Sequence, residues 1–176
     1  MEQTYVILLR GVTPTGKNRV LCADLRAALA DTELHNVSTY IQSGNVIARS
    51  ALDRTAVETL VHQAILQRIG PDLSIIARTH AQLKAVLQGN PFAPEASART
   101  YFTLLATQPA PQRAEDFLKL DFAPDAIYLN SDTLYTLYAE RLSASRFNNN
   151  VYERKLKVAA TTRNFNTITR LVELSA

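Results

Sequence analysis

Short apolar runs in the first half of the chain alternate with segments whose apolar residues lie three and four positions apart. The short runs are rich in β-branched and aromatic residues and predict strands over 4–9, 37–41, 45–49 and 73–77. The spaced segments predict two helices, over 22–30 and from Asp53, a good capping residue, to Gly70-Pro71. The resulting order of strand, helix, strand, strand, helix and strand is that of a ferredoxin-like βαββαβ unit.

The second half of the chain begins with the same order of elements. Strands are predicted over 100–106, 126–129 and 134–139, with a helix over 111–120 after the first of them. Helices over 143–156 and 164–174 complete the chain. We therefore predict an α+β fold of two ferredoxin-like α/β-plait subdomains. Residues 1–79 form the first, residues 80–98 a connecting helix and loop, and residues 99–176 the second, with its C-terminal helices.

The first predicted strand is apolar on both faces. Tyr5, Ile7 and Leu9 point to one side, whereas Val6 and Leu8 point to the other. A sheet with one wetted face would alternate apolar and polar residues. We therefore expect both faces to be covered, either by the other half of the chain or by a partner chain.

The basic residues are concentrated near the C-terminus. The 176 residues carry a net charge of +3, but residues 141–176 alone carry seven basic and two acidic side chains. This asymmetry is consistent with an anionic partner, and equally with an ordinary solvated helix face.

Other features of the composition favour a cytoplasmic protein without metal or cofactor. The single cysteine, Cys22, permits no internal disulfide. No apolar run approaches the roughly 20 residues needed to cross a bilayer, and the first residues lack the basic region and cleavage site of a signal peptide. His35, His62 and His80 do not have the spacing of metal ligands. We expect no membrane association, and both monomer and homodimer remain open.

The segment GVTPTGKN, Gly11 to Asn18, has the G-x-x-x-x-G-K spacing of a phosphate-binding loop. In a nucleotide-hydrolysing P-loop a Ser or Thr hydroxyl follows the lysine and binds Mg²⁺. Asn18 has no hydroxyl, Pro14 removes an amide donor, and the helix is predicted to begin near Cys22 rather than at Lys17. We therefore expect either a turn-rich connection or a loop that binds phosphate or carboxylate without hydrolysis.

The segment YIQSGNV, Tyr40 to Val46, predicts a tight hairpin. Ser43, Gly44 and Asn45 supply residues that tolerate positive φ, as such a turn demands. Gln42 and Asn45 could alternatively hydrogen-bond a ligand. Ser43 lacks both the G-x-S-x-G frame and the neighbouring base of a nucleophile.

The segment VAATTRNFNTITRL, residues 158–171, predicts the start of the last helix, with Thr161 or Thr162 as its cap. Its apolar residues form a buried stripe at Phe165, Ile168, Leu171 and Val172. Its polar residues are expected on the opposite side, at Arg163, Asn166, Thr167 and Arg170. They serve capping and solubility, or they form an anion site at the helix N-terminus.

Three segments together resemble the signatures of the bacterial domain-of-unknown-function family 1697 (DUF1697). They are LLRGVTPTGKNRV (8–20), NVSTYIQSGNVI (36–47) and VAATTRNFNTITRL (158–171), and NPF (90–92) matches a lesser signature. The chain departs from the usual family pattern at residues 13–15, and it has Phe165 where the family usually carries Trp. The resemblance implies two ferredoxin-like α+β subdomains and an uncharacterised protein with no assigned activity.

The resemblance also indicates which polar positions to suspect, and their amide and guanidinium groups favour an anion. The candidate ligand-binding residues are Arg10, Gly11, Gly16, Lys17, Asn18, Gln42, Ser43, Asn45, Thr162, Arg163, Asn164 and Asn166. We expect the loop after the first strand and the hairpin before the third to lie at opposite ends of their sheet. The candidates would then form at least two separate clusters.

The favoured function is an anion-binding module for a phosphorylated small molecule or a nucleic acid. One alternative is a small-molecule enzyme with a cleft between the subdomains, which would need an acid or base such as Asp24, His35 or Tyr40. The other is a structural or interaction protein without a ligand, in which the motifs only form turns and caps. No catalytic residue is identified by the sequence.

Overall fold

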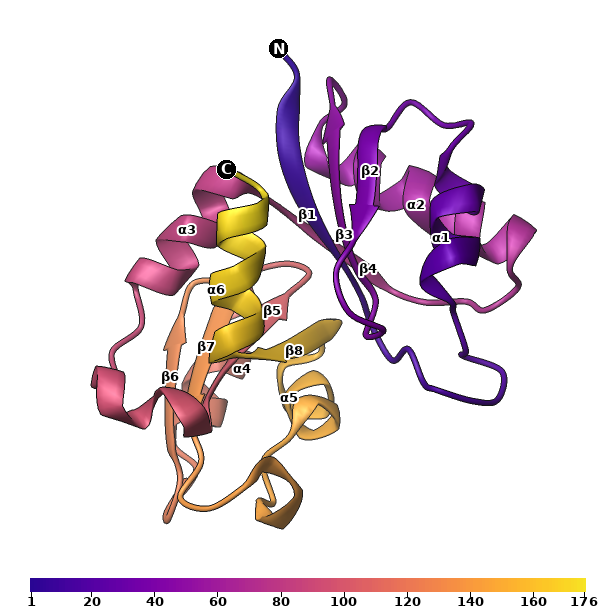
Figure 1. The fold of residues 1–176 in the computed structure, drawn as a ribbon. Coiled ribbons are helices and arrows are strands. Elements are labelled where there is room, and N and C mark those ends of the chain that lie inside the picture. Colours follow the sequence, from indigo (N-terminus) through magenta and orange to yellow (C-terminus); the bar gives the residue numbers. More distant parts are fainter. The chain divides into compact units, whose positions relative to one another are not determined.

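The structure, a computed structural model, describes all residues from 1 to 176 and contains two four-stranded antiparallel sheets (Figure 1). The first sheet and its helices comprise β1 (Gln3–Leu9), α1 (Cys22–Leu29), β2 (His35–Thr39), β3 (Asn45–Ser50), α2 (Arg54–Arg68) and β4 (Ile75–Thr79). The strand order β2-β3-β1-β4 is that of a ferredoxin-like sheet.

The second sheet repeats this arrangement. Its elements are β5 (Thr100–Leu105), α4 (Pro111–Leu118), β6 (Ala126–Asn130), β7 (Thr133–Leu137), α5 (Asn149–Leu156) and β8 (Ala160–Asn164). The strand order β6-β7-β5-β8 follows the same permutation as the first sheet. The predicted α+β fold of two ferredoxin-like units is therefore confirmed.

Two further helices and two 3₁₀ turns complete the chain: α3 (His80–Gln88), α6 (Phe165–Leu174), η1 (Pro94–Arg99) and η2 (Leu142–Ala144). The chain divides into one compact unit of residues 1–85 with 171–176 and a second of residues 86–170. Within the first unit, His80 at the start of α3 and Ser175 after α6 are joined by a side-chain hydrogen bond of 3.0 Å. None of the helices is long and apolar enough to cross a bilayer.

The core of the first unit lies between its sheet and the helices α1 and α2. Tyr5, Ile7 and Leu9 of β1 are buried in one cluster with Leu25 of α1 and Val61 of α2. Val6 and Leu8 point to the opposite face and are fully buried as well. Both faces of β1 are therefore removed from water, as the sequence pattern predicts.

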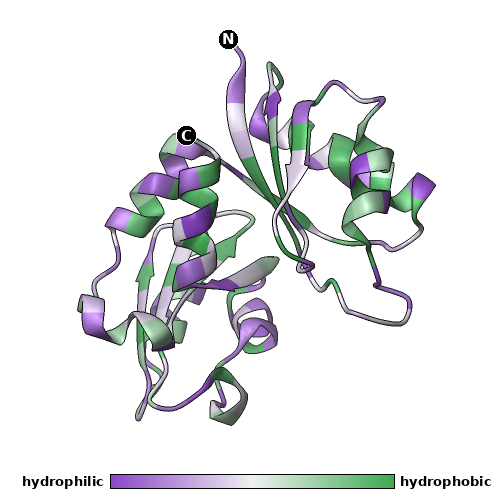
Figure 2. Ribbon diagram, viewed as in Figure 1, coloured by the Kyte–Doolittle hydropathy of each residue, from purple (hydrophilic) through white to green (hydrophobic).

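The core of the second unit is rich in aromatic side chains. Phe117 of α4 and Tyr152 of α5 pack with their ring centroids 5.9 Å apart, and both belong to one buried cluster with Leu134 of β7. The Tyr152 hydroxyl is hydrogen-bonded to the Thr136 hydroxyl at 2.8 Å. Along α6, hydrophobic and hydrophilic residues alternate from turn to turn (Figure 2).

The helix expected over 164–174 is confirmed as α6, but its expected cap at Thr161 or Thr162 is wrong. These threonines lie in β8, and Thr162 pairs with Thr103 of β5. Neither Thr161 nor Thr162 caps a helix; the Asn164 side chain does so by accepting a hydrogen bond of 2.8 Å from the Thr167 amide. β-Branched threonines suit a strand, and β8 supplies the fourth strand that completes the second βαββαβ unit.

Two smaller expectations near this segment are also corrected. Thr167, expected on the polar side of the last helix, is buried. The helix expected over 143–156 is confined to Asn149–Leu156, because the Asn148 side chain caps it by accepting a hydrogen bond of 3.1 Å from the Val151 amide.

Candidate functional site

The loop after β1 and the hairpin between β2 and β3 lie together. The Leu9 amide donates a hydrogen bond of 2.8 Å to the Gly44 carbonyl, and Leu8 pairs with Asn45. The expectation that these segments lie at opposite ends of the sheet is therefore wrong. Because β1 and β3 are antiparallel, the end of β1 lies beside the start of β3. We call residues 10–21 and 40–45 the loop cluster.

Gly44 makes this close approach possible. It is buried and has a φ of +74°, a conformation that L side chains rarely adopt. A Cβ atom at this position would lie 2.7 Å from the Leu9 Cβ and 2.8 Å from the Val12 Cγ2. The hairpin can therefore pack against the β1 end and its loop only with glycine here.

Gln42 links the hairpin to the start of α1. Its Nε2 donates to the Val20 carbonyl, and its Oε1 accepts a hydrogen bond of 3.3 Å from the Cys22 amide. Leu21, at the N-cap position of α1, offers no side-chain acceptor, so Gln42 caps this helix from 20 residues away in the chain. Both ends of the Gln42 amide are thus engaged within the protein.

Asn45 holds the hairpin itself. Its side chain is fully buried, and Nδ2 donates to the Tyr40 carbonyl at 3.0 Å and to the Ser43 hydroxyl at 2.8 Å. The Tyr40 amide in turn donates to the Asn45 carbonyl at 3.0 Å. Gln42, Ser43 and Asn45, all proposed from sequence as ligand contacts, therefore take part in the internal structure of the loop cluster.

The loop from Gly11 to Val20 is folded on itself. The Thr13 amide donates to the Asn18 carbonyl at 3.1 Å, and the Asn18 side chain donates back to the Gly11 carbonyl at 3.3 Å. The Arg19 amide closes a turn to the Gly16 carbonyl at 3.2 Å. α1 begins only at Cys22, so this is not the strand-loop-helix geometry of a P-loop, as expected from the sequence.

The outer side of this loop is basic. Lys17 and Arg19 are both exposed, and no acidic residue occurs between Glu2 and Asp24 in the sequence. The backbone amides of Gly16, Lys17 and Asn18 donate to no other group of the chain. The loop therefore presents two cations and three amide donors on one short, internally bonded turn.

The remaining candidates lie on β8 and the start of α6, in the second unit. The Thr162 hydroxyl is hydrogen-bonded to the Thr103 hydroxyl at 2.8 Å and to Asn149 Oδ1 at 2.9 Å. Arg163 Nη1 donates to the Thr161 hydroxyl at 2.8 Å and to the Thr162 carbonyl at 2.9 Å. Burial lowers the pKa of Arg163 to about 10, so its guanidinium stays charged at neutral pH.

Two of the acid and base candidates, His35 and Asp24, share no hydrogen bond with each other. His35 Nδ1 lies 2.6 Å from Glu2 Oε1, and Asp24 lies on the exposed side of α1. No group of three His, Cys, Asp or Glu side chains is placed to hold a metal ion. Asn166, the last candidate, is exposed on the first turn of α6.

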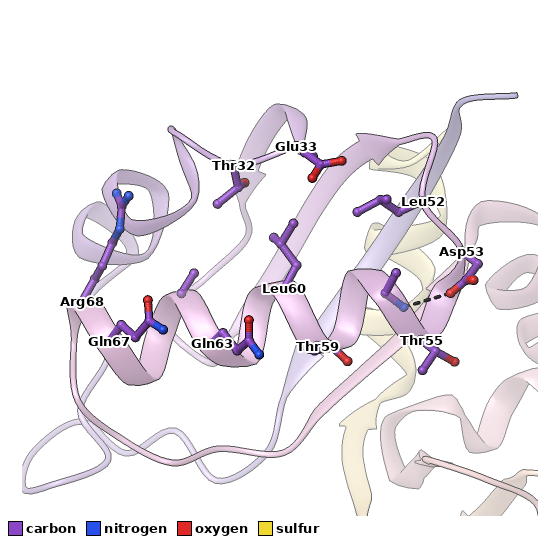
Figure 3. Close-up of a pocket in the computed structure, with 12 residues that line it drawn as sticks. Thr32, Glu33, Leu52, Asp53, Thr55, Thr59, Leu60, Gln63, Gln67 and Arg68 are labelled. Carbon is purple, nitrogen blue, oxygen red and sulfur yellow. Dashed lines mark hydrogen bonds between the residues drawn. The ribbon is translucent and has the colours of Figure 1, made fainter.

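A hollow of about 630 Å³, not predicted from the sequence, lies along α2 (Figure 3). Its α2 wall carries a polar stripe at four-residue spacing, Thr55, Thr59, Gln63 and Gln67, beside an apolar one of Ala56, Leu60 and Ala64. Residues four positions apart lie on one face of a helix, so this spacing indicates the polar stripe already in the sequence. The two charged groups at its ends are engaged, because Asp53 Oδ1 accepts from the Ala56 amide at 2.9 Å and Arg68 pairs with Asp31 at 3.2 Å.

Comparisons with known proteins agree with the fold. The family model described as "Protein of unknown function (DUF1697)" matches residues 2–135. A solved structure, "The structure of conserved bacterial protein SP0830 from Streptococcus pneumoniae", is similar over 100% of both chains, with a TM-score of 0.73 and 21% sequence identity. No curated protein matches the chain.

Proposed function

The chain belongs to the DUF1697 family, whose description names no activity, and we propose that its loop cluster binds the phosphate groups of a ligand. One observation carries the proposal. Exposed Lys17 and Arg19 stand beside three backbone amides that donate to no other group of the chain, on a turn with no nearby acid in the sequence. Ammonium, guanidinium and amide donors together are the groups that proteins use to bind phosphate.

The internal bonding of the loop supports this role. Binding a ligand with a flexible loop costs conformational entropy, and a loop already folded loses less. The Thr13 amide and the Asn18 side chain hold the loop from within, and Gln42 anchors its end at Val20. In this proposal Gln42, Ser43 and Asn45 position the loop, whereas Lys17, Arg19 and the amides contact the ligand.

The experiment compares nucleic acids with small phosphates. Fluorescence anisotropy of labelled single-stranded RNA, single-stranded DNA and duplex DNA would be measured at about 50 and about 200 mM salt, the range over which phosphate contacts are most sensitive. Unlabelled pyrophosphate would be added as a competitor and also titrated directly by calorimetry. Binding of RNA or DNA that weakens steeply with salt indicates a polyanionic ligand, and binding of pyrophosphate alone indicates a small phosphorylated molecule.

A matched pair of double variants locates the binding. Lys17→Ala with Arg19→Ala removes two exposed cations from the loop, and Arg154→Ala with Lys155→Ala removes two exposed cations from α5. We expect the loop variant to lose most of the affinity and the α5 variant to keep it. Equal losses of affinity in both variants would refute the proposal. A wild type that binds neither nucleic acid nor pyrophosphate at the lower salt would refute it as well.

A further inference from the structure

We propose that two copies of this chain pair through β6, in an antiparallel register centred on Tyr128, to form one continuous sheet. β6 lies at the end of the second sheet, next to β7 (Figure 1). The hairpin that joins the two strands has a two-residue turn, Ser131 and Asp132, closed by the pair Asn130–Thr133. Because hydrogen-bonded pairs alternate along an antiparallel ladder, the N–H and C=O groups of Ile127 and Leu129 point away from β7.

The other three sheet edges are protected within the chain. β2 is interrupted by a register shift between His35 and Ser38. On β4 the Ala77 amide donates to Glu58 at 2.8 Å, and the Thr79 amide donates to Gln82 at 2.9 Å. Bulges and covering side chains are the devices by which proteins keep an edge strand from pairing.

The edge of β8 is covered in the same manner. The Ala160 amide donates to Glu153 at 2.9 Å, and its carbonyl accepts from the Asn149 side chain at 2.9 Å. No comparable hydrogen bond from a side chain reaches the outward groups of Ile127 or Leu129. β6 is therefore the edge that has no such protection.

The sequence of β6, AIYLN, fits a second copy of itself. In the proposed register Ile127 faces Leu129 of the other copy, Ala126 faces Asn130, and Tyr128 faces Tyr128. The strand carries no charge, and the nearest acids, Asp125 and Asp132, would face the uncharged residues Ser131 and Pro124. No like charges are therefore opposed, and the two exposed tyrosines would form a cross-strand aromatic pair.

This register predicts four hydrogen bonds between the copies, two at each Ile127–Leu129 pair. Ile127 and Leu129 are partly buried on the inner face of the second unit, packed against its core. Pairing would continue this apolar layer from one copy to the next. Tyr128, which is 51% exposed in the single chain and packs against Tyr135, would lose water contact on the opposite face of the sheet.

Sedimentation velocity of the full chain from about 10 µM to about 1 mM tests the association. Tyr128→Lys places two ammonium groups opposite each other, and Tyr128→Glu places two carboxylates there. Each variant should raise the dimer dissociation constant about tenfold, and an equimolar mixture of the two should restore association. Far-ultraviolet circular dichroism of each variant confirms that the fold is kept.

Crosslinking tests the register. In a Cys22→Ser background, Tyr128→Cys places the two thiols in a pair whose Cα atoms lie roughly 4.5 Å apart, which a disulfide can span. Ala126→Cys places the introduced cysteines of the two copies about 13 Å apart along the paired strands, so this variant should not crosslink. A monomer at all concentrations, dimerisation that the Tyr128 variants leave unchanged, or equal crosslinking at both positions would overturn the proposal. If β6 instead pairs with an extended peptide of another protein, the chain alone would be a monomer at all concentrations.

Discussion

Glu58 on α2 accepts a hydrogen bond of 2.8 Å from the backbone amide of Ala77 on β4. The second unit contains the equivalent contact, in which Glu153 on α5 accepts from the Ala160 amide on β8 at 2.9 Å. In each unit the second helix thus supplies a carboxylate to the outer edge of the last strand. The two halves share this device although their sequences show no residue-level repeat.

Replacing Glu58 with alanine should destabilise the first unit. The Ala77 amide would lose its acceptor at a sheet edge, a loss of about 1–2 kcal/mol in the free energy of unfolding. Urea denaturation measures the difference. Glu115→Ala, at an exposed glutamate of α4, provides the control and should stay within about 0.5 kcal/mol of the wild type. Equal effects of the two substitutions would contradict a role for the Glu58–Ala77 contact.

Glu58→Gln should reveal the cost of the half-buried charge. Burial raises the pKa of the Glu58 carboxyl above its ordinary value, although the Ala77 amide, Arg54 and Arg78 oppose the shift. Because the pKa is higher in the folded protein than in the unfolded chain, protonation of Glu58 favours the folded state at acidic pH. This contribution to stability is lost as the pH rises through the pKa of the folded protein. Glutamine keeps the acceptor and stays neutral. The stability of the variant relative to the wild type should therefore increase as the pH is raised from 4 to 7, as measured by urea denaturation at each pH. A difference in the free energy of unfolding that does not change with pH would refute this.

Two glycines of the loop cluster should respond differently to alanine. Gly44→Ala combines a φ of +74° with a contact of 2.7 Å to the Leu9 Cβ, and we expect a loss of about 3 kcal/mol. Gly16 has a similar φ of +81°, but a Cβ there would meet nothing within 4 Å. Gly16→Ala should therefore cost only about 1 kcal/mol. Thermal and urea denaturation of both variants separate backbone strain from steric overlap, and equal losses would exclude the overlap.

The sequence predicts the apolar strands and the helices of the first unit well because their residues carry strong local signals. β1 is a run of β-branched and aromatic residues, and Asp53 caps α2 as expected, through the Ala56 amide. β8 was missed because ATTRN shows no apolar alternation and its threonines resemble helix caps, whereas the structure places the cap of α6 at Asn164. Pairing with β5, a tertiary contact, decides this segment.

The arrangement of the candidate site was harder to predict than its residues. That Gln42 caps α1 depends on a contact across 20 residues of chain, which local patterns do not encode. The error about the two ends of the sheet arose from topology: in the order β2-β3-β1-β4 the antiparallel β1 and β3 are adjacent. Applying this pairing to the predicted strands would have placed Leu9 beside Gly44.

Gln42 should contribute to both stability and binding. Gln42→Ala removes the acceptor for the Cys22 amide and the donor to the Val20 carbonyl, and we expect a loss of about 1 kcal/mol. If the loop is held in place for a ligand, the affinity for phosphate should fall although Gln42 makes no contact with it. Denaturation and the anisotropy titration measure the two effects in one preparation. A loss of stability with unchanged affinity would limit Gln42 to a structural role.

Thr162 provides the corresponding test on β8. Its hydroxyl connects Thr103 of β5 to Asn149 of α5, so Thr162→Val, which keeps the shape, should leave these two groups without a shared partner. We expect a loss of about 1–2 kcal/mol in the free energy of unfolding. Thr169→Val, at a hydroxyl bonded to the carbonyl four residues earlier in α6, is the matched control and should have a smaller effect. If Thr162→Val instead kept full stability and abolished anion binding, the β8 threonine would be a ligand contact, as first inferred from the sequence.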